Sequence, residues 1–300
     1  MSGFSAIDLS KLPAPDAVKV LDVETILSDL KAEAISRDPA LAEALSLESE
    51  PLVKFLEVVA YRILLLRQQI NEAARATMLA FARGSDLDHI GALFGVERAV
   101  VFPALLNEIP PVAAVMEQDD RFRGRIQLSL EGFSTAGTFG GYRFFALSAS
   151  GSLADVAVLN PAPGVVRVVI LDSAGDGSAD AGLIATVQSA LDAESVRPLC
   201  DTVNVVSATI VPFSIDATLT FFDGPDPAVV MAAAQAAVEA FVAGQRLVGR
   251  DIPRAGIIAA LYQSGVQNVA LVSPAADVAI ADDEAGSCTA ISIVSGGLGD

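Results

Sequence analysis

The sequence predicts an α+β protein with a long N-terminal helix for an intermolecular bundle, followed by a mixed middle domain and two small C-terminal α/β units. Two observations favour this class. Residues 52–83 lack glycine and proline and carry a heptad pattern of apolar residues. From residue 155 onward, short β-branched runs alternate with helical patterns. The expected divisions are residues 1–48, 49–83, 84–154, 155–211 and 212–300.

The first two segments are expected to be helical. Residues 1–48 are expected to form a proline-containing N-terminal arm, followed by a short helix from Val20 to Ile35. The long helix of residues 49–83 opens at Ser49-Glu50-Pro51, because serine caps helices and proline suits their first turn. We expect Gly84 to end it.

One row of positions on the long helix alternates four and three residues apart, which is typical of the seam of a helix bundle. The seam comprises Leu52, Leu56, Val59, Ile63, Leu66, Ile70, Ala73, Thr77 and Ala80. Two arrangements can bury it: a bundle within the chain, or a bundle with helices of other chains. The flanking sequence supplies few helices of comparable length, so we favour partner helices from other chains.

The remaining segments mix helices and strands. Residues 84–154 contain a charged helix start at Asp119 and several glycine-rich turns. The units 155–211 and 212–300 each alternate strands with helices. The expected strands are 165–171, 203–211, 213–221, 266–272 and 289–294, and the expected helices are 181–193, 227–244 and 253–265.

The composition disfavours several classes of function. The net charge of −18 disfavours nucleic-acid binding, which needs a basic surface. The sequence contains no run of about 20 uncharged apolar residues, so we do not expect membrane insertion. The N-terminus does not resemble a signal peptide. Apolar residues nevertheless make up 52% of the chain, which suggests large interfaces between subunits. The two cysteines, Cys200 and Cys288, form no disulfide framework.

The stretch RGSDLDHIGALFGVER holds the single histidine, His89, beside Asp86 and Asp88. A hydrolytic enzyme using His89 with either aspartate is the alternative hypothesis. No GxSxG motif accompanies it, and the chain has too few Cys and His residues for a zinc site. The loop 172–180 departs from calcium-loop spacing. We therefore expect no catalytic residues, no metal and no cofactor, and we interpret His89 as a surface or interface residue.

The arginines at 121, 123 and 125 share no single helix face, so an anion site there is disfavoured. We expect surface ion pairs with Glu117, Asp119 or Asp120 instead.

Four stretches in a specific order resemble the baseplate J-like family of contractile phage tails and related injection machines. They begin at Ala73, Asp119, Ser134 and Arg197, and together they span about residues 70–210. One departure is the glycine-rich Thr138-Phe-Gly-Gly-Tyr142, where a more polar approach to a helix is expected.

The resemblance implies a structural baseplate wedge component without catalytic residues. Its implied partners are a second copy, another wedge protein, the central hub or spike, and sheath or fibre proteins. The C-terminal domains would join neighbours into a ring around the hub. The implied location is the tail baseplate of a virion or injection particle, after assembly in the host cytoplasm.

Overall fold

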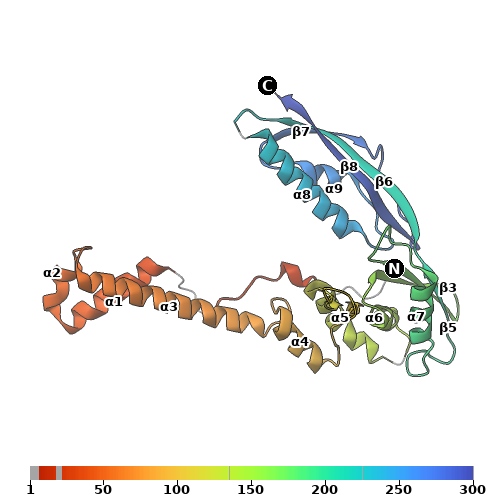
Figure 1. Cartoon of the computed structure of the whole chain (residues 1–300), viewed down its shortest axis with the longest axis horizontal. Helices are drawn as coiled ribbons and strands as arrows, with labels where there is room; N and C mark the ends of the chain where they lie inside the picture. Colours follow the sequence, from red (N-terminus) through yellow and green to blue (C-terminus); the bar gives the residue numbers. More distant parts are fainter. Residues whose placement is uncertain (1–6, 18–21, 135, 225, 300) are drawn as a thin grey trace. The chain divides into compact units, whose positions relative to one another are not determined.

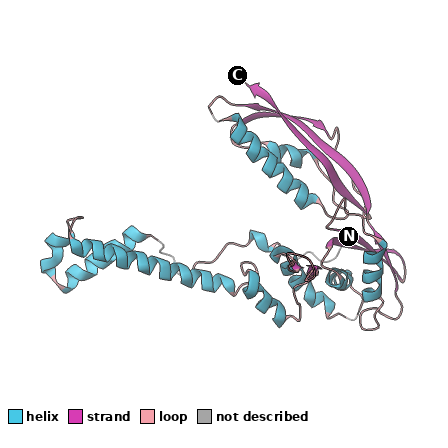
Figure 2. Ribbon diagram, viewed as in Figure 1, coloured by secondary structure: helices cyan, strands magenta, loops and turns pink. Residues whose placement is uncertain are grey.

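The computed structural model describes residues 7–17, 22–134, 136–224 and 226–299. They form two compact units: the N-terminal unit, Ile7–Glu97, and a second unit that begins at Arg98. The N-terminal unit contains helices, whereas the second contains helices and three sheets (Figure 2). This confirms the predicted α+β class.

The N-terminal unit is built on two helices that lie side by side (Figure 1). Its elements are η1 Leu9–Lys11, α1 Val23–Arg37, η2 Pro39–Leu41, α2 Ala42–Leu45, α3 Pro51–Ala76 and α4 Gly84–Leu93. The Asp22 carboxylate caps α1 by accepting from the Thr25 amide at 2.8 Å. Ile26 on α1 and Val53 and Ala60 on α3 are buried. The long helix is therefore partly covered within the chain.

The long helix ends earlier than its sequence predicts. α3 stops at Ala76, seven residues before Arg83, and Thr77 is its C-cap. The Thr77 hydroxyl donates to the Ala74 carbonyl at 2.8 Å, a local bond that competes with continued helix. A turn then buries Ala82. Gly84 has φ +50° but opens α4, so the prediction that it ends the long helix is wrong.

The second unit begins with paired short strands, β1 Val100–Phe102 and β2 Val115–Met116, and two helices, α5 Asp119–Gly132 and α6 Phe139–Ala149. Thr138 caps α6 by accepting from the Gly141 amide at 3.0 Å. A Cβ at Gly140 would lie 2.6 Å from Cγ of Glu131 on α5. The glycines that depart from the family pattern therefore let these helices approach closely.

The middle sheet has the strand order β3-β4-β5. β3 Leu153–Ala162 runs antiparallel to β4 Val165–Asp172, and β4 runs parallel to β5 Thr202–Ser207 after the crossover helix α7 Ala181–Leu191. The core joins β4 to helices α6 and α7 through Ala146, Val168, Ile170, Val187 and Leu191. The β-branched run of β4 is buried as predicted.

The C-terminal sheet has the order β7-β6-β8. β6 Thr209–Phe221 runs antiparallel to β7 Val266–Ser273 and parallel to β8 Glu284–Leu298. Helices α8 Pro227–Gln245 and α9 Arg254–Leu261 cover one face (Figure 1). Ile215, Leu219, Val238 and Ile257 pack between the sheet and helices, as the alternation along β6 predicts.

Two C-terminal features differ from simple sequence patterns. The predicted strand 203–211 is divided at Ala208, which is buried where the two sheets meet, and β6 starts at Thr209. Helix α8 is long and apolar enough to cross a membrane by length and composition alone. It instead packs on the sheet through Val230, Ala234 and Val238.

Candidate assembly interfaces

The contact of α3 with its own chain uses a row beside the predicted seam. Val53 and Ala60 on this row are buried. Of the seam, Leu52, Leu56, Val59, Ile63 and Ala80 are half-buried, and Leu66, Ile70, Ala73 and Thr77 are exposed. Because α3 ends at Ala76, Thr77 and Ala80 are not helical positions. The seam is thus only partly covered, and Phe55 and Val58 widen its exposed apolar surface.

The histidine stretch forms a helical joint. Asp86, Asp88 and His89 are all exposed on α4, whereas Leu87 and Gly91 are buried on its packed side. Among the residues that the structure describes, no group of three or more His, Cys, Asp or Glu side chains is placed to hold a metal ion. His89 therefore lies exposed on α4 and belongs to no such group among these residues.

A buried ion cluster lies in the second unit. Glu117 and Arg125 are 3% and 4% exposed, and Arg125 Nε donates to both carboxylate oxygens of Glu117 at 3.1 and 3.2 Å. Arg121 pairs with the same carboxylate and donates to the carbonyls of Leu147, Ser150 and Leu153. Burial lowers the pKa of the Arg121 guanidinium, and the Glu117 charge opposes this shift.

Sequence reasoning predicted surface ion pairs for these arginines. That prediction holds for Arg123, whose partner Asp120 is 99% exposed, and is wrong for Arg121 and Arg125. The sequence signal for the pair of arginines is their spacing, because Arg121 and Arg125 lie four residues apart on one face of α5. Glu117 precedes the N-cap Gln118, so its place beside both arginines depends on how the chain enters the helix.

The cluster holds the two ends of residues 100–116, a segment that we call the arm. The Ala99 amide donates to Glu117 Oε1 at 2.9 Å, and Arg98 donates to the Glu117 carbonyl at 2.8 Å. Farther out, β1 pairs with β2 and Leu105 bridges to Val112. Both ends of the arm are therefore held together at a buried charged anchor.

The arm is almost entirely apolar yet exposed. Glu108 is its single charged residue, and Ile109 near its tip is 98% exposed. The other exposed large apolar residues are Val100, Phe102, Leu105, Leu106, Val112, Val115 and Met116. Monomeric proteins rarely expose contiguous apolar patches larger than a few hundred Å², so the arm has the character of a docking surface. The arm was not among the sequence-based candidates, because its prolines and short strands gave no periodic signal.

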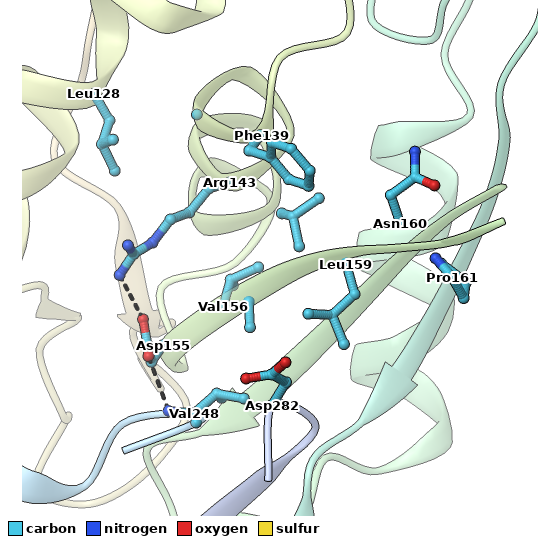
Figure 3. Close-up of a pocket in the computed structure, with 14 residues that line it drawn as sticks. Leu128, Phe139, Arg143, Asp155, Val156, Leu159, Asn160, Pro161, Val248 and Asp282 are labelled. Carbon is cyan, nitrogen blue, oxygen red and sulfur yellow. Dashed lines mark hydrogen bonds and ion pairs between the residues drawn. The ribbon is translucent and has the colours of Figure 1, made fainter. Parts of the chain in front are cut away.

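Asp155 joins the middle sheet to the C-terminal domain. Its Oδ1 accepts from Arg143 at 2.7 Å and its Oδ2 from the Val248 amide at 3.0 Å (Figure 3). The groove beside this contact is lined by both domains, through residues that include Phe139, Leu159 and Asp282.

Arg246 makes a second connection between these domains. Its guanidinium donates to the carbonyls of Ser173 and Gly175 at 3.2 and 2.9 Å. In the same loop, Asp172 and Asp176 accept from backbone amides two residues on. The acidic loop 172–180 is thus a structured turn that accepts hydrogen bonds from an arginine of the C-terminal unit.

Three models of the baseplate J-like family match the chain in order. The N-terminal domain matches residues 48–104, the central domain residues 134–207 and the C-terminal domain residues 213–294. Baseplate protein J of Escherichia phage P2 is 47% identical over 296 residues, covering 97% of this chain and 98% of that protein. The chain belongs to the baseplate J-like family.

A solved structure also resembles this baseplate J-like chain. It is a chain of the six-fold symmetrised cryo-EM structure of the anti-feeding prophage baseplate, with a TM-score of 0.42 at 16% identity. The match covers 59% of this chain and 43% of that one, which is less than half its length. Most of the arm lies between the N-terminal and central family models, in residues 105–133.

Proposed function

We propose that this chain is a structural, non-catalytic wedge component of a contractile-tail baseplate. Family membership supports the baseplate assignment, and phage P2 baseplate protein J is its relative over nearly the full length. The observation that carries the structural role is the uncovered apolar face of α3, where Leu66 and Ile70 are 57% and 45% exposed. Exposed apolar residues in a regular helical row are the usual mark of a helix that packs against a partner.

The proposed partners of the seam are helices of a second copy and of another wedge protein. The arm is a second contact surface, suited to a protein partner because it is apolar and nearly uncharged. The central hub or spike and the sheath or fibre proteins complete the proposed set of neighbours, with C-terminal domains joining a ring around the hub. The proposed location is the baseplate of a virion or injection particle, reached after assembly in the host cytoplasm, without membrane insertion or nucleic-acid binding.

No observation favours the hydrolytic alternative. Asp86, Asp88 and His89 are exposed on one short helix, and a hydrolase needs its acid and base in a site that positions substrate. Replacing His89 by alanine should leave assembly unchanged. A loss of turnover on a defined substrate in His89→Ala, with assembly intact, would instead identify an enzyme.

The seam is tested by co-expression with the neighbouring tail proteins. Ile63→Asp with Ile70→Asp should block association, because a charge in a packed apolar interface is strongly destabilising. A second variant, Leu66→Asp with Ile70→Asp, changes two residues that are exposed in this chain. It should therefore leave the contact between α1 and α3 intact. The control, Gln68→Asp with Gln69→Asp, adds the same charge at exposed positions outside the seam.

Association is measured by co-purification and analytical ultracentrifugation, and folding by circular dichroism. Normal assembly of both seam variants would contradict the bundle. So would a wild-type chain that stays monomeric at high concentration beside its neighbours.

A further inference from the structure

Two parts of the second unit have hydrophobic cores of their own. We call residues 119–207 the middle-sheet domain and residues 209–299 the C-terminal domain. The core of the first lies between the middle sheet and helices α6 and α7, and the described residues in it all come from that domain. The core of the second lies between β6 and helices α8 and α9, and its described residues likewise come from that domain alone. Each domain can therefore stay folded without packing on the other.

A smaller core, which we call the junction core, lies where the two domains meet. Its buried members in the described part of the chain are Val169 and Leu171 of β4, Ala208, and Ala285 of β8. Two of these four residues are alanines, and the residues packed around them are partly buried. Stabilisation by apolar burial scales with the area removed from water. The junction core therefore holds the two domains together less strongly than each domain's own core holds its elements.

A short segment between α8 and α9, residues 246–249, reaches across the junction, and we call it the clasp. It is anchored in the C-terminal domain, because Val248 forms a β-bridge with Ala285 and the Gly249 amide donates to the Glu284 carbonyl at 2.9 Å. If the two domains separate, the clasp should therefore stay with the C-terminal domain and release the middle-sheet domain.

Two residues of the clasp bind the middle-sheet domain. Arg246 donates to carbonyls of the exposed turn 173–175, and the Val248 amide donates to the Asp155 carboxylate. Asp155 also accepts from Arg143 of its own domain, so it keeps a partner when the Val248 amide leaves. The exposed carbonyls become hydrated in the same event. The clasp can therefore release without leaving a buried charge unpaired, which is the outcome that would cost most.

The chain crosses between the two domains at the peptide that joins Ala208 to Thr209. The Ala208 amide donates to the Ile170 carbonyl of β4 at 2.9 Å, whereas the Thr209 amide donates to the Asp283 carbonyl beside β8 at 3.0 Å. Rotation at this peptide therefore leaves the hydrogen bonds of both sheets in place. The ion pair of Asp283 with Arg167 also spans the junction, but its side chains are 35% and 39% exposed, so it contributes little.

We propose that the C-terminal domain opens from the middle-sheet domain as a rigid body, with the clasp as the contact that releases and the Ala208–Thr209 peptide as the hinge. Opening separates the junction core but leaves both sheets and both domain cores intact. It exposes the face of β4 that carries Val169, while the face that carries Val168 stays covered by α6 and α7. Such an opening needs less free energy than unfolding, because less apolar surface meets water. It is a property of the chain itself and does not depend on the proposed baseplate role.

Thiol labelling of the full-length chain tests the opening by comparing the two faces of β4. Val168 and Val169 are adjacent and each is 0% exposed, but Val168 lies in the core of the middle-sheet domain and Val169 in the junction core. In a background with Cys200→Ser and Cys288→Ser, each valine is replaced by cysteine, and modification by N-ethylmaleimide is followed under native conditions. Val169→Cys should react at least about tenfold faster than Val168→Cys, because opening uncovers only the junction core. Its rate should also depend less on urea, because opening exposes less surface than unfolding.

Changes at Arg246 test the clasp in both cysteine backgrounds. Arg246→Ala should raise the Val169→Cys rate about tenfold, the order expected when a charged donor loses its hydrogen bonds, and should leave the Val168→Cys rate within about twofold. Arg246→Lys, which keeps the positive charge, should restore part of the protection. The control is Arg197→Ala, which removes an arginine paired with Asp192 of the same domain and should change neither rate. Equal labelling of the two thiols, a Val169→Cys rate that follows global unfolding in urea, no response to Arg246→Ala, or an equal rise at both positions would each overturn the proposal.

Discussion

The carboxylate of Glu117 accepts hydrogen bonds from Arg125 in an almost fully buried pair, at 3.1 and 3.2 Å from Nε. Removing one member of a buried ion pair leaves the other charge buried without its partner, which lowers stability by about 3–5 kcal/mol. Glu117→Ala should therefore lower the free energy of unfolding by about that amount, measured by urea denaturation. Asp120→Asn, which breaks the exposed pair with Arg123, should change it far less. Equal effects of the two changes would contradict the buried cluster.

The arm should be dispensable for folding but needed for docking. Leu106→Asp with Ile109→Asp changes two residues that are largely exposed, so the melting temperature should stay within about 2 °C of the wild type, as expected for surface substitutions. Binding of a hydrophobic dye and co-purification with neighbouring tail proteins should both fall. A matched change elsewhere, Gln68→Asp with Gln69→Asp, should alter neither. Unchanged co-purification of the arm variant would show that this surface does not bind those proteins.

Asp155 should hold the C-terminal domain to the middle sheet. In Asp155→Ala, the Val248 amide loses its acceptor and Arg143 loses its partner, which should cost about 1–3 kcal/mol. Arg143 is partly exposed, so water compensates part of its loss. Hydrogen exchange at residues 246–249 should accelerate, whereas Asp283→Asn, in the more exposed pair with Arg167, should leave it near the wild-type rate. Slow exchange in Asp155→Ala would contradict the connection.

Tyr142 should make stability depend on alkaline pH. Burial raises the pKa of this buried tyrosine, and its 2.8 Å hydrogen bond to Asp201 raises it further. A folded-state pKa above the unfolded value gives stability that is complete below pH of about 10 and is lost as the pH rises through the folded pKa. Tyr142→Phe should lose about 1 kcal/mol at neutral pH and decline less steeply above pH 10. Parallel pH profiles for the two proteins, measured by denaturation from pH 8 to 11, would refute this role.

Much of the fold follows from local patterns. The β-branched run of β4 and the alternation along β6 predict strands that the structure contains, because each residue's burial depends on which face of one sheet it occupies. The starts of α5 at Asp119 and of α8 at Pro227 are likewise determined by residues within one helical turn. Strand ends that depend on distant contacts are harder to predict from the sequence. The division between β5 and β6 falls at Ala208 because that residue is buried where the middle and C-terminal sheets meet.

The interfaces were less accessible to sequence reasoning. The heptad row predicts an apolar seam, but which row of α3 covers its own chain depends on α1, and the covered row is the neighbouring one through Val53 and Ala60. Arg121, which pairs with Glu117, also donates to the carbonyls of Leu147, Ser150 and Leu153, which lie 26 to 32 residues farther along the chain and so give no local sequence signal. The role of the seam as a contact with partner helices remains a prediction.

A single residue, Ala208, separates β5 from β6, so one extended path runs from the middle sheet into the C-terminal sheet. Both strands have a parallel neighbour, β4 for β5 and β8 for β6. A pulling force along this path would load the hydrogen bonds of each parallel ladder together, in shear, instead of breaking them one after another from an end. Tension applied to either sheet along this path would reach the other through a link of one residue, with no loop between them to extend first.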